Sequence, residues 1–429
     1  MARRKPRVRT FEADILDLAH DGRGIAKING KTVFVHGALP GEHVTLTVYR
    51  KKRSFDEAIT DSVHTASPQR VAPVCAAFGV CGGCAMQHLS DADQRSHKRT
   101  QLEHDLQKIG GVAPHSWLPD LAAEPWHYRR RGRLGVKQVI GKGRVLVGFR
   151  ERRSSYIADM ASCPILAHPV DALITPLSDL IGSLSVADKV PQIEIAVGDE
   201  VTALVFRHLQ AMSEQDLNTL QTFAREWNVD VYLQPGGPAS VVPLGEVREL
   251  SYHLPQFDVE IGFQPLDFLQ VNTELNRRMI SHVIGNAALR PGDHVLDLFC
   301  GLGNFTLPLA RCADVVVGVE GDDNLVTRAR ANAVRNGLEN VEFHVGNLFT
   351  PEVQWPWLNK AYDVVFIDPP RAGAQEILPF VAKTGPRMIA YVSCHPATLA
   401  RDAAILVNDF GYRLSKCGIM DMFPHTAHV

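Results

Sequence analysis

Residues 294–304 read His294-Val-Leu-Asp-Leu-Phe-Cys-Gly-Leu-Gly-Asn304, an apolar run that leads into two glycines. This pattern predicts a buried strand, a tight turn and the start of a helix. Gly301 and Gly303 allow the backbone of the turn to approach a ligand closely, because no side chain stands in the way. A lone Gly-x-Gly also fits a purely structural turn, so its meaning depends on the strands around it.

Apolar strands alternate with helical stretches from this point onward. We predict strands at residues 295–299, 315–320, 341–345, 364–368, 388–393 and 412–420. This order predicts a parallel sheet covered by helices on both faces, with ligands bound at the carboxyl ends of the strands. Glu320 ends the second strand, where a carboxylate accepts hydrogen bonds from ribose hydroxyls. Asn347 follows the third strand, where an amide can read an adenine edge.

Together these motifs resemble those of the class I S-adenosylmethionine-dependent methyltransferases, which are α/β enzymes with a Rossmann-like sheet. A nicotinamide enzyme is the second interpretation of the glycine turn. It is disfavoured because Thr306 stands where the Gly-x-Gly-x-x-Gly fingerprint has its last glycine.

Two later segments narrow the chemistry. Ile367-Asp-Pro-Pro-Arg-Ala-Gly373 ends the fourth strand, and Tyr391-Val-Ser-Cys-His-Pro-Ala-Thr398 ends the fifth. Adjacent strand ends would place Asp368 and Cys394 on one rim. A lone cysteine at a strand end is often a small buried apolar residue, but the Ser-Cys-His-Pro turn is expected to project this one outward.

Methylation of uracil at C5 is a reaction in which a projecting thiol beside a methyl donor is useful. Uracil C5 becomes nucleophilic only after a group adds to C6, and a thiolate suits that addition. A base must then remove the C5 proton.

The first 66 residues predict a small closed barrel. We expect short strands at residues 11–18, 24–28, 32–36, 43–48 and 57–63, separated by glycine turns. The run Asp21-Gly22-Arg23-Gly24-Ile25-Ala26 resembles the TRAM domain, an OB-like module that binds RNA. A structural appendage is the alternative, and an excess of basic residues favours RNA contact.

Residues 67–262 predict an α+β central domain. A helix is expected from about Ser90 to Ile109, with Leu102, Leu106 and Ile109 on one face and Gly110-Gly111 at its end. Strands are predicted at residues 131–136, 145–149, 193–197, 201–206 and 229–233, and a second helix at 214–227.

The net charge of −2 conceals two basic blocks. Residues 1–53 contain twelve Lys or Arg and five Asp or Glu, and residues 129–153 contain ten and one. Either block alone could be a solvated face, but two favour RNA held in a defined place. No apolar run approaches the roughly 18 residues that a membrane helix requires, and the basic start lacks the apolar stretch of a signal peptide. We therefore expect a cytoplasmic protein with no membrane partner.

Four of the eight cysteines form a pattern typical of a metal site. Cys75, Cys81 and Cys84 lie close together in the sequence and Cys163 lies before a proline. Structural disulfides are not expected in the cytosol. Four thiolates suit either a tetrahedral zinc or a [4Fe-4S] cluster. The five-residue gap between Cys75 and Cys81 is wider than usual in a zinc knuckle, and both metal groups stay open on the spacing alone.

From the barrel to Cys394, nearly the whole chain resembles the RNA uracil-5-methyltransferase family. The resemblance implies a TRAM barrel at 1–66, a central domain with the iron–sulfur site at 67–262, and a methyltransferase domain at 263–429. The helix at 90–110 would pack on the methyltransferase domain. A barrel combined with an iron–sulfur cluster implies, within the family, an enzyme that modifies 23S rRNA. We expect it to be a monomer. Cys394 would be the nucleophile, and the methyl donor would contact Gln270, Phe299, Asn304, Glu320, Asn347 and Asp368.

The sequence departs from the family in two places. His395 follows the nucleophile where the family has asparagine. The family also has a catalytic glutamate just after the position of Val429, followed by a final strand. We therefore expect a truncated chain that leaves the edge at 412–420 unpaired and that accumulates the covalent intermediate. The alternatives are an RNA-binding form with an incomplete catalytic site, methylation of another RNA, and methylation of a small molecule.

Overall fold

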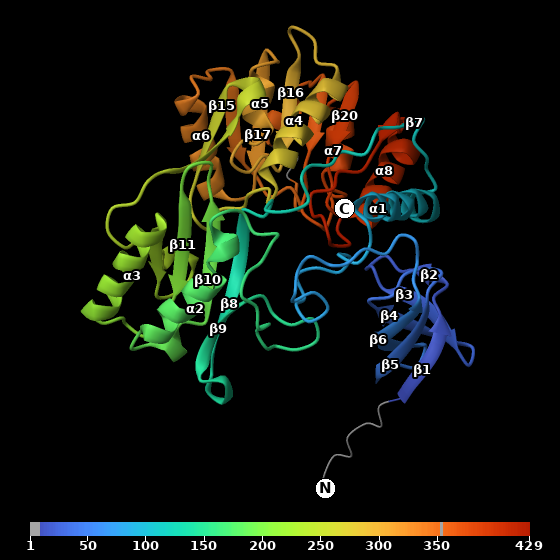
Figure 1. Cartoon of the computed structure of the whole chain (residues 1–429). Coiled ribbons are helices and arrows are strands. Elements are labelled where there is room, and N and C mark those ends of the chain that lie inside the picture. The colour runs from blue at the N-terminus through green and yellow to red at the C-terminus, as the bar shows by residue number, and fades with distance from the viewer. Residues whose placement is uncertain (1–8, 352–354) are drawn as a thin grey trace.

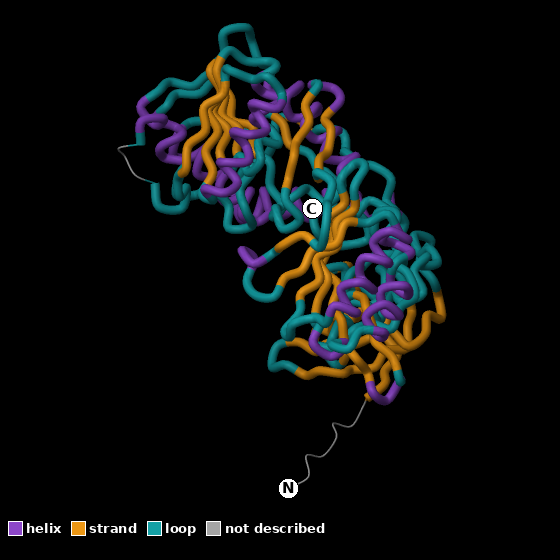
Figure 2. The backbone as a smooth tube through the Cα atoms, turned by 90° about the vertical axis from the view of Figure 1, so that its left-hand side faces the viewer, coloured by secondary structure: helices purple, strands orange, loops and turns teal. Residues whose placement is uncertain are grey.

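The computed structural model describes residues 9–351 and 355–429, which form a barrel, a central α/β part and a larger α/β part (Figures 1 and 2). The first eight residues of the N-terminal basic block lie outside the described residues. Among the helices that are described, none is both long and apolar enough to cross a membrane.

The N-terminal part is a closed six-stranded barrel, as predicted. Its strand order is β1-β5-β6-β4-β3-β2. Only Ile15 and Leu16 separate β1 from β2, so one continuous segment pairs with β5 at its start and with β3 at its end. Ile15 itself is buried with the alternating apolar residues of the other strands. The strands are β1 (Arg9–Asp14), β2 (Asp17–Leu18), β3 (Gly24–Ile28), β4 (Lys31–His36), β5 (His43–Lys51) and β6 (Phe55–Thr65).

The predicted helix after the cysteine-rich loop is α1 (Asp91–Asp105), which continues into a π-helical turn at Leu106–Gly110. Ser90 caps its start by accepting a hydrogen bond from the Asp93 N–H. Leu102 and Leu106 are buried against α8 (Pro396–Phe410), but Ile109 is exposed. The prediction for Ile109 is wrong because the π-helical turn contains more residues than an α-turn and rotates this side chain off the buried face.

The central part has a six-stranded sheet in the order β13-β12-β11-β10-β8-β9. All five predicted strands are present, and α3 (Glu214–Trp227) begins at a capping box formed by Ser213 and Asp216. A helix that we did not predict, α2 (Ile174–Ser183), packs beside β9. The strands are β8 (Arg131–Val139), β9 (Arg144–Gly148), β10 (Gln192–Val197), β11 (Thr202–Arg207), β12 (Asp230–Gln234) and β13 (Val242–Pro243).

The C-terminal part is a parallel sheet in the order β18-β17-β16-β19-β20, so the order reverses beside β16. Five of the six predicted strands are confirmed. The crevice at such a reversal is the usual ligand site of an open α/β sheet. The strands are β16 (His294–Leu298), β17 (Val315–Glu320), β18 (Val341–Val345), β19 (Val364–Ile367) and β20 (Met388–Tyr391). The other helices are α4 (Thr273–Ala287), α5 (Thr306–Ala310), α6 (Asp323–Arg335) and α7 (Leu378–Lys383).

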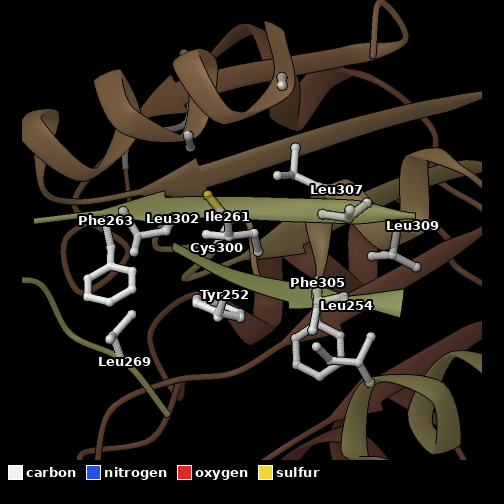
Figure 3. Close-up of a cluster of buried hydrophobic side chains, with 14 of the residues drawn as sticks. Tyr252, Leu254, Ile261, Phe263, Leu269, Cys300, Leu302, Phe305, Leu307 and Leu309 are labelled. Carbon is white, nitrogen blue, oxygen red and sulfur yellow. The ribbon is translucent and has the colours of Figure 1, made fainter. Parts of the chain in front are cut away.

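An unpredicted hairpin packs against the glycine turn. It consists of β14 (Leu250–Leu254) and β15 (Val259–Phe263), and its apolar side chains meet Leu302 and Phe305 in one buried cluster (Figure 3). Asn332 of α6 ties the hairpin down, because its side-chain oxygen accepts from the Gly262 N–H at 2.9 Å and its amide donates to the Leu302 carbonyl at 3.2 Å. The hairpin therefore fixes the back of the glycine turn.

The sixth predicted strand, at 412–420, is wrong in both length and place. Only Lys416–Cys417 is a strand, β21, and it pairs in parallel with β7 (Ser116–Trp117) rather than with the large sheet. In the segment 412–420, the side chains of Cys417 and Ile419 are buried against α1 and α8 instead. A groove of about 460 Å³ lies between this segment and β20, and it is lined mainly by apolar residues of β20, α8 and 412–420.

Candidate active site

The predicted site residues lie at the carboxyl ends of the parallel strands. Cys394 follows β20, Asp368 follows β19 and Glu320 ends β17. Phe299 follows β16 and Asn347 follows β18, while Gln270 lies in the loop that leads to α4. The sheet topology thus collects residues from 270 to 394 along one rim.

The thiol of Cys394 is exposed and lies beside the guanidinium of Arg371. The pKa of Cys394 is raised overall: partial burial and the nearby Asp368 carboxylate raise it, and the charge and hydrogen bond of Arg371 offset only part of that rise. A cation at this place favours the thiolate, which is the reactive form. His395 caps α8, since its Nδ1 accepts from the Thr398 N–H at 3.3 Å. The departure from asparagine therefore keeps a side-chain cap at this turn.

Asp368 is the second group beside the nucleophile. Burial raises its pKa to about 7, and the hydrogen bond from Gln270 Nε2 at 3.4 Å acts in the opposite direction. The structure thus brings Gln270 and Asp368 together from positions 98 residues apart. An anionic Asp368 would attract a cation such as a sulfonium.

The glycine turn and Glu320 also meet as predicted. The Gly301 N–H donates to Glu320 Oε2 at 3.2 Å, and the other carboxylate oxygen accepts from the Gly321 N–H at 2.6 Å. Gly301 has φ +54°, and a Cβ added there would face open space, so its backbone borders an unfilled volume. Phe299, with φ +63°, lies 5.7 Å from the ring of Phe349.

The two predicted asparagines, Asn304 and Asn347, differ in whether their side chains are free to bind a ligand. Asn304 exchanges two hydrogen bonds of 2.9 Å with Asn276, and its oxygen also accepts from Tyr252. Its side chain therefore anchors the turn to α4 and β14. Asn347 is exposed, and its oxygen accepts from the Phe349 N–H at 3.2 Å.

Asp297 of β16 lies behind the glycine turn and is fully buried. Thr306 donates to its carboxylate at 2.6 Å, which explains why threonine occupies the last position of the glycine fingerprint. Burial, with repulsion from Asp368 and Glu320, raises the pKa of Asp297 to about 7, although the hydrogen bonds from Thr306 act in the opposite direction. Three carboxylates thus surround one small region, an arrangement that suits a cationic ligand.

These raised pKa values predict a pH-dependent stability. Between pH 4 and 7 the folded state holds protons on Asp297 and Asp368 that the unfolded state releases, so the free energy of unfolding should fall as pH rises through this window. Asp297→Asn keeps an acceptor for Thr306 and removes the charge. We expect the drop in Tm between pH 5 and 8, measured by scanning calorimetry, to be about 3 °C smaller in this variant. The exposed Asp409→Asn control should behave like the wild type, and an equal drop in both variants would contradict the prediction.

The four predicted cysteine ligands line one small pocket together with Phe78, Phe149 and Met160. Burial raises the pKa of Cys84 to about 11 and that of Cys163 to about 12, so a metal group would have to displace their protons. The Gly83 N–H donates to Cys81 Sγ at 3.4 Å.

Much of the basic block at 129–153 is engaged by the protein itself. Arg130 pairs with Asp199 and Arg133 with Glu194, each at 2.5 Å, and Lys142 and Arg144 both pair with Asp159. The prediction of a basic surface along the whole block is therefore too broad. Next to the cysteine loop, however, Arg153 lies over the ring of Tyr49 in the barrel at 4.4 Å. Exposed cations remain at this junction, at Arg150 and Arg153.

Sequence reasoning gave no role to Arg371, His428 or Asp297. Arg371 stands inside the quoted Asp-Pro-Pro-Arg segment, and a cation near a predicted thiolate was the signal available for it. His428 lies 3.4 Å from Arg371, a contact between residues 57 apart that no sequence spacing predicts. Asp297 lies inside a predicted buried strand, and its place in the sequence alone does not indicate a role at the site.

Comparison with known families matches two parts of the chain. A methyltransferase domain family matches residues 289–404, and the TRAM domain family matches residues 4–58. The tRNA (uracil-54, C5)-methyltransferase of Pyrococcus abyssi, solved in complex with S-adenosyl-L-homocysteine, shares the fold with a TM-score of 0.74. It is 24% identical, and the match covers 97% of both chains.

Several curated relatives bear the name 23S rRNA (uracil(1939)-C(5))-methyltransferase RlmD. That of Alkalilimnicola ehrlichii is 52% identical over all of this chain and 96% of its own length. Those of Aromatoleum aromaticum and Xanthomonas axonopodis are 50% and 48% identical, with coverage of 97% or more on both sides. At this identity and coverage, the chain belongs to the RlmD family of 23S rRNA (uracil-C5)-methyltransferases.

Proposed function

We propose that this chain transfers a methyl group from S-adenosylmethionine to carbon 5 of a uridine in 23S rRNA, with Cys394 as the nucleophile. The observation that carries the proposal is the meeting of Cys394, Arg371 and Asp368 at the ends of the adjacent strands β19 and β20. The relatives are named for uracil 1939, and their similarity over the whole chain supports the equivalent uridine as the target.

The reaction begins at Cys394. Its thiolate, stabilised by Arg371, adds to C6 of uracil, so that an S–C6 bond forms and the C5–C6 electron pair moves into an enolate. C5 then bonds to the methyl carbon, the bond from methyl to sulfonium sulfur breaks, and S-adenosylhomocysteine leaves. Loss of the C5 proton to a base returns an electron pair that expels Cys394 as thiolate. The uridine must leave its stack to reach this rim.

For the methyl donor we propose the groups that surround the glycine turn. Glu320 is held at the turn by Gly301 and would accept from ribose hydroxyls, and Asn347 is exposed beside it. Gln270 and Asp368 lie between this place and Cys394. Phe299 and the backbone up to Asn304 would complete the site.

We further propose that Cys75, Cys81, Cys84 and Cys163 hold a [4Fe-4S] cluster, with zinc as the alternative. When bound, the group would join the loop at 75–84 to Cys163 by covalent bonds, which stabilises the fold and transfers no electrons in the reaction above. The junction of Tyr49 with Arg153 lies next to this loop and presents cations and a ring, which suits single-stranded RNA.

The function is tested by labelling. The chain is incubated with S-adenosylmethionine tritiated in the methyl group and with unmodified transcripts of 23S rRNA or tRNA, and the digested nucleosides are separated. We expect methyl label on the uridines of the 23S transcript, recovered as 5-methyluridine or as a methylated nucleotide still bound to the protein, and at least tenfold less on tRNA. Label in another nucleoside, or preferential labelling of tRNA, would contradict the proposal.

A further inference from the structure

Helix α1 holds a segment from the far end of the sequence, residues 421–428. Lys98 is 1% exposed, and its ammonium donates to Asp421 Oδ1 at 2.5 Å and to the Phe423 carbonyl at 3.1 Å. Figure 1 shows the C-terminus beside α1, and Figure 2 shows it between the two α/β parts. A helix near residue 100 thus fixes a segment more than 320 residues away.

Further bonds fix the same segment at His425. The buried Gln94 accepts from the His425 N–H at 2.8 Å, and the Ala85 and Met86 N–H groups donate to the His425 carbonyl at 2.8 and 3.0 Å. The ring of His425 stacks on Trp126 with 4.0 Å between centroids. His425 has φ +65°, a conformation that costs a non-glycine residue about 1 kcal/mol or more. The surrounding contacts therefore impose this shape on the segment.

The other end of the segment reaches the nucleophile. The ring of Phe423, whose carbonyl is bound by Lys98, meets the ring of His428 edge-on at 5.7 Å. His428 Nδ1 lies 3.4 Å from Arg371 Nη2, and Arg371 is the cation whose charge acts on the Cys394 thiol. A continuous series of contacts thus runs from Lys98 to Arg371, the residue that lowers the pKa of the thiol.

A buried ion pair needs a reason beyond stability. Burying two charges costs much of what their attraction returns, and apolar residues of similar volume often serve folding equally well. What Lys98 supplies and an apolar residue cannot is a fixed donor for the Phe423 carbonyl. This donor specifies the position of the segment.

We propose that Lys98 and Gln94 are positioning residues of the methyl-transfer reaction, which hold residues 421–428 so that Arg371 stays at the thiol of Cys394. The inference rests on the proposed function of Cys394 as nucleophile. It assigns to α1, a helix outside the parallel sheet, control over the geometry of the catalytic rim.

The test compares Lys98→Met with Lys108→Met, since Lys108 is exposed at the end of the same helix. Two rates are measured in the full chain: formation of the covalent adduct with 23S RNA containing 5-fluorouridine, and alkylation of Cys394 by iodoacetamide at pH 7, followed by peptide mass spectrometry. For Lys98→Met we expect adduct formation at saturating RNA to slow at least tenfold, with the RNA affinity changed less than twofold. Alkylation should slow at least about fivefold, because a displaced Arg371 stabilises the thiolate less. Lys108→Met should match the wild type.

Lys98→Met leaves Asp421 as an unpaired buried charge and can unfold the chain. The double variant Lys98→Met, Asp421→Leu removes both charges. We expect it to regain the Tm of the wild type while both rates stay slow. A double variant with rates within twofold of wild type would show that the pair serves folding only and would overturn the positioning role. If the wild type forms no adduct, the proposed function fails, and the alkylation rates still decide the role of Lys98.

Discussion

Cys394→Ala should abolish the covalent adduct with RNA that contains 5-fluorouridine and lower methyl transfer at least 10⁴-fold, while the RNA still binds. Addition to C6 makes C5 nucleophilic, and no other step in the reaction supplies that electron density. Fluorine at C5 cannot leave as a proton does, so the wild-type adduct should persist on a denaturing gel. The measurement is the fraction of protein shifted on that gel, together with the single-turnover rate of tritium transfer.

Cys312 offers a matched control, because it is also an exposed cysteine but lies at the end of α5, away from the rim. Cys312→Ala should give the wild-type amount of adduct. An adduct that survives in Cys394→Ala and disappears in Cys312→Ala would show that Cys312, not Cys394, is the nucleophile. Binding of the same RNA is measured by filter retention, since a Cys394→Ala chain that no longer binds RNA would report misfolding instead.

The elements that the sequence predicted well are those whose local pattern and tertiary role agree. The strands at 315–320 and 364–368 are continuous apolar runs, and such runs are stable only when buried on both faces of a parallel sheet. The helix at 214–227 has its own capping box and a periodic apolar face. In these cases the local sequence pattern is sufficient, because tertiary packing favours the same secondary structure as the local pattern does.

The errors come from long-range packing. The segment 412–420 has strand-like composition, but its side chains are buried by α1 and α8, so only Lys416 and Cys417 form a strand, with one isolated bridge at Met420. Ile109 fits a helical face until the last turn becomes π-helical. The hairpin at 250–263 was missed because its partner, the glycine turn, is some 40 residues further along the chain.

The same distinction holds at the site. Glu320 and Asp368 could be predicted because each ends a recognisable strand, and topology alone brings strand ends together. The role of Lys98 could not, because it depends on a contact with the segment at 421–428. For Arg371 the position beside a predicted thiolate was an available signal, but its contact with His428 was not, because 57 residues separate the two. For Asn304 the position was right, but its hydrogen bonds to Asn276 and Tyr252 depend on α4 and the hairpin.

The second large effect is expected at the cysteine cluster. Cys84→Ala should reduce the iron of an anaerobic preparation from four atoms per chain to less than one, and lower the Tm by about 10 °C or more. The described residues of the loop at 75–89 form no helix or strand, and the apolar cluster beside the four cysteines is small, with only Ala77, Cys81 and Ala158 buried. The measurements are iron, sulfide and zinc analysis, visible absorbance and calorimetry.

Loss of the cluster should also disturb the active site at the ends of the strands. Ala85 and Met86 lie directly after Cys84, and their N–H groups donate to the His425 carbonyl and so help to fix residues 421–428. We therefore expect Cys84→Ala to slow adduct formation at Cys394, in any fraction that stays folded, by a factor similar to that of Lys98→Met. Cys417→Ala is the control, since this buried thiol packs between α1 and α8 outside the cysteine pocket and should leave the iron content unchanged. One zinc per chain with no iron in the wild type would replace the iron–sulfur assignment. Full iron in Cys84→Ala would remove this residue from the ligand set.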